Sequence, residues 1–148
     1  MPELAVNCIN SWKKYLPDYE LVLWNEDDFY INCNQYVKEA YESKKYAFVT
    51  DYVRLYALYN HGGIYMDTDV EVLKSLDEFL EHRAFTGCEN GHMCVTGTMA
   101  AEKGHKWIEG LLIDYNDKKF ILPDGSFDKT PNIQMITELT INKYGLKS

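Results

Sequence analysis

The stretch that decides the fold covers residues 47–80 and reads AFVTDYVRLYALYNHGGIYMDTDVEVLKSLDEFL. Its first half is apolar at nearly every helical position, which predicts a helix buried between two layers. The helix is expected to end at Gly62 and Gly63, because glycine adopts the left-handed conformation of a C-cap at no steric cost. A short apolar strand, 64–66, then leads into Asp67 and Asp69. This order of helix, strand and acidic pair predicts an α/β protein.

Three polar side chains interrupt the apolar surface of this helix. Thr50, Asp51 and Arg54 fall within one arc, since successive residues are about 100° apart around a helix. A charge in such a helix is unfavourable unless it is paired or meets a polar ligand. Two interpretations stay open: an internal Asp51–Arg54 ion pair that fixes the helix, or a ligand site that uses both side chains.

The triplet Asp67-Thr68-Asp69 leaves the end of the predicted strand. In an open α/β sheet, ligands bind just beyond the carboxyl ends of the strands. Two carboxylates at that place suit Mg²⁺ or Mn²⁺, which prefer oxygen ligands and share their coordination with phosphate. The alternative is a polar strand exit with no ligand.

The combined pattern T-D-x-x-R followed by G-G-I-Y-x-D-T-D-V resembles the glycosyltransferase sugar-binding region containing a DXD motif, in the family 32 glycosyltransferases. That group includes bacterial capsular polysaccharide transferases and yeast-type mannosyltransferases, and it is similar to the catalytic domains of clostridial glucosylating toxins. The resemblance implies a GT-A-like nucleotide-sugar-binding fold with a mixed, mostly parallel sheet flanked by helices. Residues 1–148 would form a single catalytic domain, truncated at both ends: relatives carry a further strand before the first helix and a further metal ligand after the last.

The resemblance also implies roles for individual residues. Asp69 would coordinate Mn²⁺ or Mg²⁺ at the donor diphosphate, and Asp67 would hold hydroxyl groups and assist the metal through water. Asp51 would bind the donor sugar, and Arg54 the diphosphate or the sugar. Such groups stabilise negative charge that grows on the departing phosphate. The reaction would retain anomeric configuration. The remaining residues implied to bind the nucleotide sugar are Thr50, Thr68, Asn25 and Asn132. Asn25 would contact the base, with a cap or turn residue as the alternative. Asn132 would contact the donor, with a helix cap as the alternative.

Composition and charge limit the partners. The net charge of -8 argues against nucleic acid as the main partner. No apolar run reaches the length of a membrane span, and the start lacks the pattern of a signal peptide, so a cytoplasmic location is expected, with attachment to the inner face of the membrane as a variant. A uridine diphosphate sugar is the first expected donor, guanosine diphosphate mannose the second, and a saccharide the acceptor. A homodimer is compatible with an uncovered sheet edge.

The rest of the chain is expected to form further helices and strands around this centre. The apolar periodicity predicts helices over 2–15, 35–46, 106–116 and 133–144, the last capped by Gly145, strands over 21–24 and 84–88, a helical turn at 76–80 and an irregular loop over 120–130. Within the second helix, Tyr36, Val37, Ala40 and Tyr41 should face inward.

Three functional hypotheses compete. The first is a metal-dependent glycosyltransferase acting on a polysaccharide or glycoconjugate. The second is a catalytically impaired fragment that still binds nucleotide or metal, and the third is an interaction module that reuses the fold. Cys88, His92 and Cys94 match no common zinc spacing.

Overall fold

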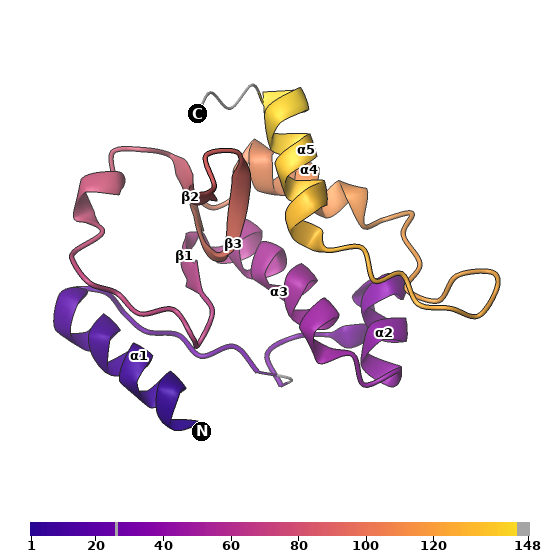
Figure 1. The fold of residues 1–148 in the computed structure, drawn as a ribbon, viewed down its shortest axis with the longest axis horizontal. Coiled ribbons are helices and arrows are strands. Elements are labelled where there is room, and N and C mark those ends of the chain that lie inside the picture. The colour runs from indigo at the N-terminus through magenta and orange to yellow at the C-terminus, as the bar shows by residue number, and fades with distance from the viewer. Residues whose placement is uncertain (26, 145–148) are drawn as a thin grey trace.

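The computed structural model describes residues 1–25 and 27–144 (Figure 1). Helices and strands mix in this part of the chain, as the sequence predicts. The helices are α1 (Glu3–Tyr15), α2 (Gln35–Glu42), α3 (Tyr46–His61), α4 (Lys106–Asp114) and α5 (Asn132–Tyr144), with 3-10 turns at Ile31–Cys33 and Asp77–Phe79; the strands are β1 (Gly63–Met66), β2 (Ala84–Glu89) and β3 (Met93–Ala101). Among the described residues, no helix combines the length and the apolar character needed to cross a membrane.

The sheet contradicts the expectation of mostly parallel strands. Its order is β1-β3-β2, and both pairs are antiparallel. The β2–β3 pair is antiparallel because the two strands form a hairpin, which closes at Asn90 and Gly91, whose φ angles are 53° and 77°. Two successive residues with positive φ form the type I′ turn, which matches the twist of paired strands. The Asn-Gly pair is the sequence signal for this hairpin, and the sequence analysis, which predicted the strand at 84–88, did not predict its pairing with 93–101.

The strand predicted at 21–24 is also wrong. Leu21, Val22 and Leu23 are 43%, 67% and 68% exposed, and no described strand pairs with them. A strand needs a neighbour for its backbone hydrogen bonds, so apolar residues alone do not make one. Only the end of the segment is held, because the Trp24 ring lies 5.2 Å from the ring of His61 on α3.

The second helix is shorter than predicted. It ends at Glu42, and Lys44 then adopts a φ of 58°, which breaks the helix before α3 begins at Tyr46. The predicted inward positions Tyr36, Val37 and Ala40 are buried, whereas Tyr41 is 36% exposed. The predicted ends of the other helices agree within one or two residues; the expected cap at Gly145 lies outside the described residues.

Helix α3 forms the centre of the molecule, as predicted. It contacts α2, α4, β1 and β3, and its apolar side chains join the main core. Gly62 follows it with a φ of 71°, and a Cβ atom there would lie 2.7 Å from the backbone nitrogen of Lys103. The chain can therefore turn from α3 into β1 only with glycine at this position, which fixes where β1 begins.

Helix α1 holds the segment that follows the acidic triplet. The indole nitrogen of Trp12 donates to the carbonyl of Val70 at 2.7 Å, and the backbone nitrogen of Val72 donates to the Ser11 hydroxyl at 2.9 Å. Trp12, Leu16 and Val72 form a second, small apolar cluster beneath these bonds. The exit of β1 is thus fixed from both sides, by α3 before it and by α1 after it.

Candidate functional site

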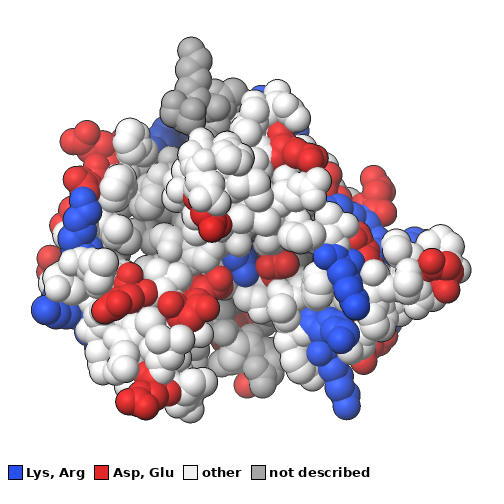
Figure 2. Space-filling model, in the orientation of Figure 1, with Lys and Arg blue, Asp and Glu red and all other residues white. Residues whose placement is uncertain are grey.

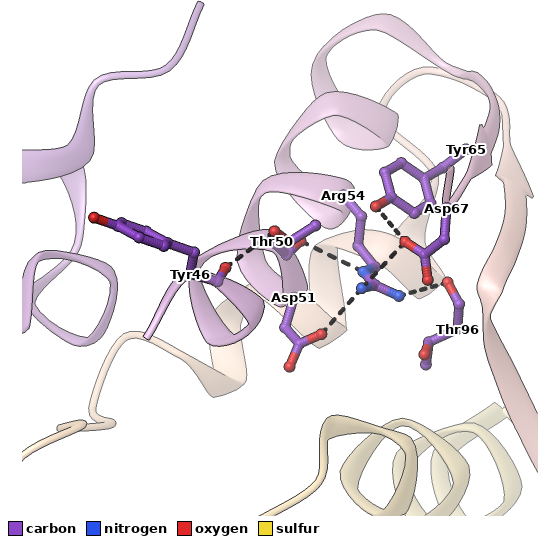
Figure 3. A network of polar contacts seen from close by, with 7 residues as sticks. All are labelled: Tyr46, Thr50, Asp51, Arg54, Tyr65, Asp67 and Thr96. Carbon is purple, nitrogen blue, oxygen red and sulfur yellow. Dashed lines mark hydrogen bonds and ion pairs between the residues drawn. The ribbon is translucent and has the colours of Figure 1, made fainter. Parts of the chain in front are cut away.

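The centre of the candidate site is the guanidinium group of Arg54, which is buried between α3, β1 and β3 (Figure 3). Its Nη2 atom lies 3.1 Å from Oδ1 of Asp51 and 3.5 Å from Oδ1 of Asp67. Its Nη1 atom donates to the carbonyl oxygen of Thr96 at 2.6 Å. Because a guanidinium group presents several donors in a fixed plane, one side chain joins three segments of the fold.

Asp67 is oriented by its neighbours in the sheet. The Tyr65 hydroxyl donates to Asp67 Oδ1 at 2.6 Å, and the Asp67 backbone nitrogen donates to the carbonyl of Gly97 at 2.8 Å. Tyr65 and Asp67 are two residues apart along the strand direction, so their side chains project to the same face. The Tyr65 ring also lies 5.0 Å from the Arg54 guanidinium carbon, a distance that permits a cation–π contact.

The electrostatics of the site are dominated by burial. Burial raises the pKa of the Asp51 carboxyl from 3.8 to about 6, although Arg54 lowers it, and the negative charge of Asp67 raises it further. Burial also raises the pKa of the Tyr65 hydroxyl, which therefore remains a hydrogen-bond donor at neutral pH. With both acids ionised, the cluster of Asp51, Arg54 and Asp67 carries a net negative charge, which favours a cation nearby.

The face of the molecule shown in Figure 2 is mixed in charge. Figure 2 shows acidic atoms on either side of a recessed basic patch near the centre of the face, over β3 and α3 in the orientation of Figure 1. Charges of both signs therefore lie close together on this face of the molecule.

The structure brings together part of the predicted site. Asp51, Arg54 and Asp67 meet, so the ion pair left open as an interpretation of the helix is present. Thr68 and Asp69 are exposed beyond β1, and within the described residues Asp69 forms no ion pair or side-chain hydrogen bond. Thr50 is exposed as well, and its hydroxyl donates back to the Tyr46 carbonyl at 3.0 Å.

The two asparagines expected near the donor behave differently. The Asn25 side chain accepts a hydrogen bond from the backbone nitrogen of Asp27 at 2.8 Å, which is the turn role considered for it. The side-chain nitrogen of Asn132, at the start of α5, is buried and has no hydrogen-bond partner among the described residues. A buried amide without a partner is unfavourable, so this nitrogen calls for an acceptor that the described residues do not supply. The roles of Asn25 and Asn132 toward a nucleotide sugar stay predictions.

Sequence reasoning missed three residues of the site. Tyr65 could have been found, because strand periodicity places it on the face of Asp67. Thr96 contributes only its backbone carbonyl, which any residue would supply, so its side chain gave no signal. Gly97 contacts Asp67 across two segments that are far apart in the sequence, and pairing of those segments was not predicted.

The residues present fit a divalent cation whose ligands come partly from the protein and partly from a substrate. No group of three or more histidine, cysteine or acidic side chains converges anywhere in residues 1–25 and 27–144, so a cage made only of protein ligands is absent there. Asp67 and Asp69 offer hard oxygen atoms, and a Cβ built at Gly97 would fill space beside Oδ2 of Asp67. One or two carboxylates with the remaining positions left for phosphate and water is how Mg²⁺ is commonly held.

Comparison with known proteins places this geometry in a family. Residues 2–86, which contain α3, β1 and the acidic triplet, match the family described as glycosyltransferase sugar-binding region containing DXD motif. No solved structure matches significantly.

Two curated relatives come from Schizosaccharomyces pombe. The chain is 31% identical over 112 residues to inositol phosphoceramide mannosyltransferase 3, covering 73% of this chain and 32% of that protein. It is 28% identical over 92 residues to inositol phosphoceramide mannosyltransferase 1, covering 57% of this chain and 29% of that protein. The chain thus spans about a third of the length of these relatives. Because more than half of its residues match the family, the chain belongs to the glycosyltransferases whose sugar-binding region contains a DXD motif.

Proposed function

We propose that this chain is the core of a metal-dependent, retaining glycosyltransferase with a GT-A-like donor site. One observation carries the proposal: Arg54 is buried between Asp51 and Asp67 at the exit of β1, within the residues that match the family. A buried cation between two acids also serves as a structural ion pair. The exposed second acid, Asp69, distinguishes the two roles, because it adds nothing to the ion pair but does add an oxygen ligand for a metal.

The proposed reaction transfers a sugar with its configuration preserved. The bond between the anomeric carbon and the diphosphate oxygen breaks, and its electron pair stays on the phosphate. The acceptor hydroxyl oxygen bonds to the same carbon on the same face, and its proton passes to the departing phosphate. A divalent cation held by Asp69 and Asp67 would supply positive charge for the diphosphate.

In this proposal, the side chains of the site bind the donor sugar and orient one another. Asp51 would accept hydrogen bonds from hydroxyl groups of the donor sugar. Arg54 donates to the Thr96 carbonyl and pairs with Asp51 and Asp67, so we assign it the orientation of both acids and the supply of positive charge behind them. This differs from the direct diphosphate contact that the sequence resemblance implies. The unpartnered side-chain nitrogen of Asn132 would donate to the donor sugar.

The names of the relatives favour an activated mannose as the donor. Both are mannosyltransferases, which supports guanosine diphosphate mannose over the uridine diphosphate sugar ranked first from sequence. We propose a saccharide or glycoconjugate as the acceptor. Cytoplasmic location and a homodimer stay predictions of the sequence.

A thermal-shift experiment tests the proposal. The chain is heated with GDP-mannose, UDP-glucose or neither, each with and without Mn²⁺, because a ligand that binds only the folded state raises the unfolding midpoint. We expect stabilisation that requires both Mn²⁺ and a nucleotide sugar, is largest for GDP-mannose, and is lost in Asp69→Asn. Full stabilisation of Asp69→Asn would remove the metal assignment.

A second candidate function is metal-dependent binding of the donor without transfer of its sugar. The two functions differ in the products. Release of free mannose or a mannosylated acceptor from GDP-mannose supports the enzyme, whereas Mn²⁺-dependent binding with no product supports the binding fragment.

A further inference from the structure

The two oxygen atoms of the Asp67 carboxylate lie in different surroundings. Oδ1 accepts the Tyr65 hydroxyl at 2.6 Å and faces Arg54 Nη2 at 3.5 Å (Figure 3). In the part of the chain that the structure describes, Oδ2 accepts no hydrogen bond and is the carboxylate atom nearest to a Cβ built at Gly97. Because Oδ1 is engaged with the protein, Oδ2 is the oxygen that remains for a ligand.

Gly97 leaves open the space beside this oxygen. A Cβ atom built on it would lie 3.3 Å from Oδ2 of Asp67 and 3.5 Å from Cγ2 of Val70. The first distance is tighter than an ordinary van der Waals contact, so the carboxylate would have to move or lose access. Gly97 cannot easily retreat, since its carbonyl accepts the Asp67 backbone nitrogen at 2.8 Å.

The backbone of Gly97 does not itself require glycine. Among the glycines that the structure describes, those with positive φ are Gly62, Gly63, Gly91, Gly104 and Gly125, and Gly97 is not one of them. An alanine could therefore adopt its backbone conformation without the strain of the left-handed region. The feature that glycine supplies at this position is space next to Asp67.

We propose that Gly97 is a positioning residue of the donor site, whose missing side chain keeps Oδ2 of Asp67 in place and accessible to a divalent cation or a donor hydroxyl. This inference rests on the proposed function and extends the site to β3, beyond the residues that match the family. It assigns β3 two contributions: the carbonyl of Thr96 orients Arg54, and Gly97 provides space for Asp67.

Gly87 provides a matched control. It lies on β2 of the same sheet, it also lacks a positive φ, and a Cβ built there would meet Cβ and Cγ2 of Val95 at 3.4 Å, an ordinary contact. The substitutions Gly97→Ala and Gly87→Ala therefore change the same chemical group on neighbouring strands, and only one of them faces the site.

The first experiment measures binding without turnover. The full chain and both variants are titrated with Mn²⁺ in the presence of GDP or UDP, with free Mn²⁺ followed by electron paramagnetic resonance. We expect Gly97→Ala to bind Mn²⁺ with nucleotide at least about tenfold more weakly, which corresponds to about 1.4 kcal/mol, and Gly87→Ala to bind as the unaltered chain does. Equal affinity of Gly97→Ala and the unaltered chain would overturn the inference while leaving the proposed function intact.

The second experiment needs no ligand, so it separates this inference from the proposed function. Urea unfolding is measured for Gly97→Ala, Asp67→Ala and the double variant. If Gly97→Ala acts by crowding the carboxylate, it should lower the unfolding midpoint in the unaltered chain and much less in the Asp67→Ala background. An equal loss in both backgrounds would overturn the inference, even if the unaltered chain binds Mn²⁺ with nucleotide. If Gly97→Ala alone does not fold, recovery of folding in the double variant supports the inference that the added methyl group crowds the Asp67 carboxylate.

Discussion

At the scale of single residues, Arg54 is the group on which the site depends. Its side chain is 6% exposed and interacts with both Asp51 and Asp67. A buried ion pair contributes little net stability compared with apolar residues of similar size, but removal of one partner leaves a charge buried without compensation. The main role of Arg54 is therefore to compensate the negative charges of Asp51 and Asp67, and its own net contribution to stability is small.

Replacement of this arginine tests that view. We expect Arg54→Met to lower the free energy of unfolding by about 3 kcal/mol near neutral pH, because Asp51 and Asp67 lose their buried counter-charge. The measurement is urea unfolding. Arg83→Met serves as the control: the Arg83 side chain is 76% exposed in its pair with Glu102, so its loss should be small. Equal losses in the two variants would contradict the proposed burial.

Asp51 should make stability depend on pH in a direction opposite to that of an ordinary paired acid. Its pKa is raised from 3.8 in the unfolded chain to about 6 in the fold, so the folded protein binds the proton more tightly. Ionisation of Asp51 thus disfavours the fold, and its contribution to stability falls as pH rises between these two values. The effect is at most about 3 kcal/mol.

The comparison that isolates this residue is Asp51→Asn. The difference in unfolding free energy between Asp51→Asn and the unaltered chain should shift in favour of the variant as pH rises from about 4 to about 7. Urea unfolding at several pH values measures it. A difference that stays constant with pH would show that Asp51 keeps an ordinary pKa.

At the scale of secondary-structure elements, β3 does more than complete the sheet. It pairs with β1 and β2, contacts α5, and supplies both the Thr96 carbonyl and Gly97 to the site. Its position depends on the hairpin turn at Asn90 and Gly91, because that turn sets the register of β2 against β3.

Substitution in the turn tests this dependence. Gly91 has a φ of 77°, so Gly91→Ala should lower the free energy of unfolding by about 1 kcal/mol, the cost of a left-handed conformation for a residue with a side chain. Asn90→Gly is the control, since glycine adopts the required φ freely and the variant should unfold close to the unaltered chain. Urea unfolding at one pH measures both variants. If Gly91→Ala has the same free energy of unfolding as the unaltered chain, the turn does not contribute to the stability of the sheet.

The elements also show what the sequence could and could not predict. Helix α3, Gly62 and β1 follow each other in the chain, so local periodicity and one glycine were enough to predict them and to bring Asp51 and Arg54 together. The partners of β1 lie more than 30 residues further along, and local pattern does not specify which distant segment pairs with a strand. The error at 21–24 has the same cause, because its apolar residues predicted a strand for which no described partner exists.

At the scale of the whole molecule, aromatic rings connect the site to the core. Tyr115 on the loop after α4 packs edge-on against Tyr36 of α2 and Tyr52 of α3, at centroid distances of 5.2 and 5.4 Å. Tyr36 in turn lies 5.4 Å from Phe120. Edge-to-face contacts of this kind add specific geometry to apolar burial. The helix that carries Asp51 and Arg54 is thus packed against α2 and against the segment that follows α4.

Such a preformed scaffold predicts how the protein responds when metal is removed. With Mn²⁺ and GDP at about 100 times the dissociation constant, binding should raise the unfolding midpoint by roughly 8 °C. Addition of a chelator should abolish that increase and leave the midpoint of the ligand-free chain unchanged, because Arg54 supplies the counter-charge for Asp51 and Asp67 from within the fold. Differential scanning calorimetry measures both. A ligand-free midpoint that falls with chelator would instead indicate a metal required for folding.

The contact between Trp12 and the Val70 carbonyl has a practical consequence for expression of this protein. A shortened version that begins after α1 would lose both the indole hydrogen bond and the Ser11 bond to Val72, the two anchors that hold the polypeptide just downstream of Asp69. Such a deletion would leave α3 and the hairpin to fold, yet amide hydrogen exchange at residues 70–72 should become faster. Designers who trim this domain to a minimal size should therefore keep its first helix.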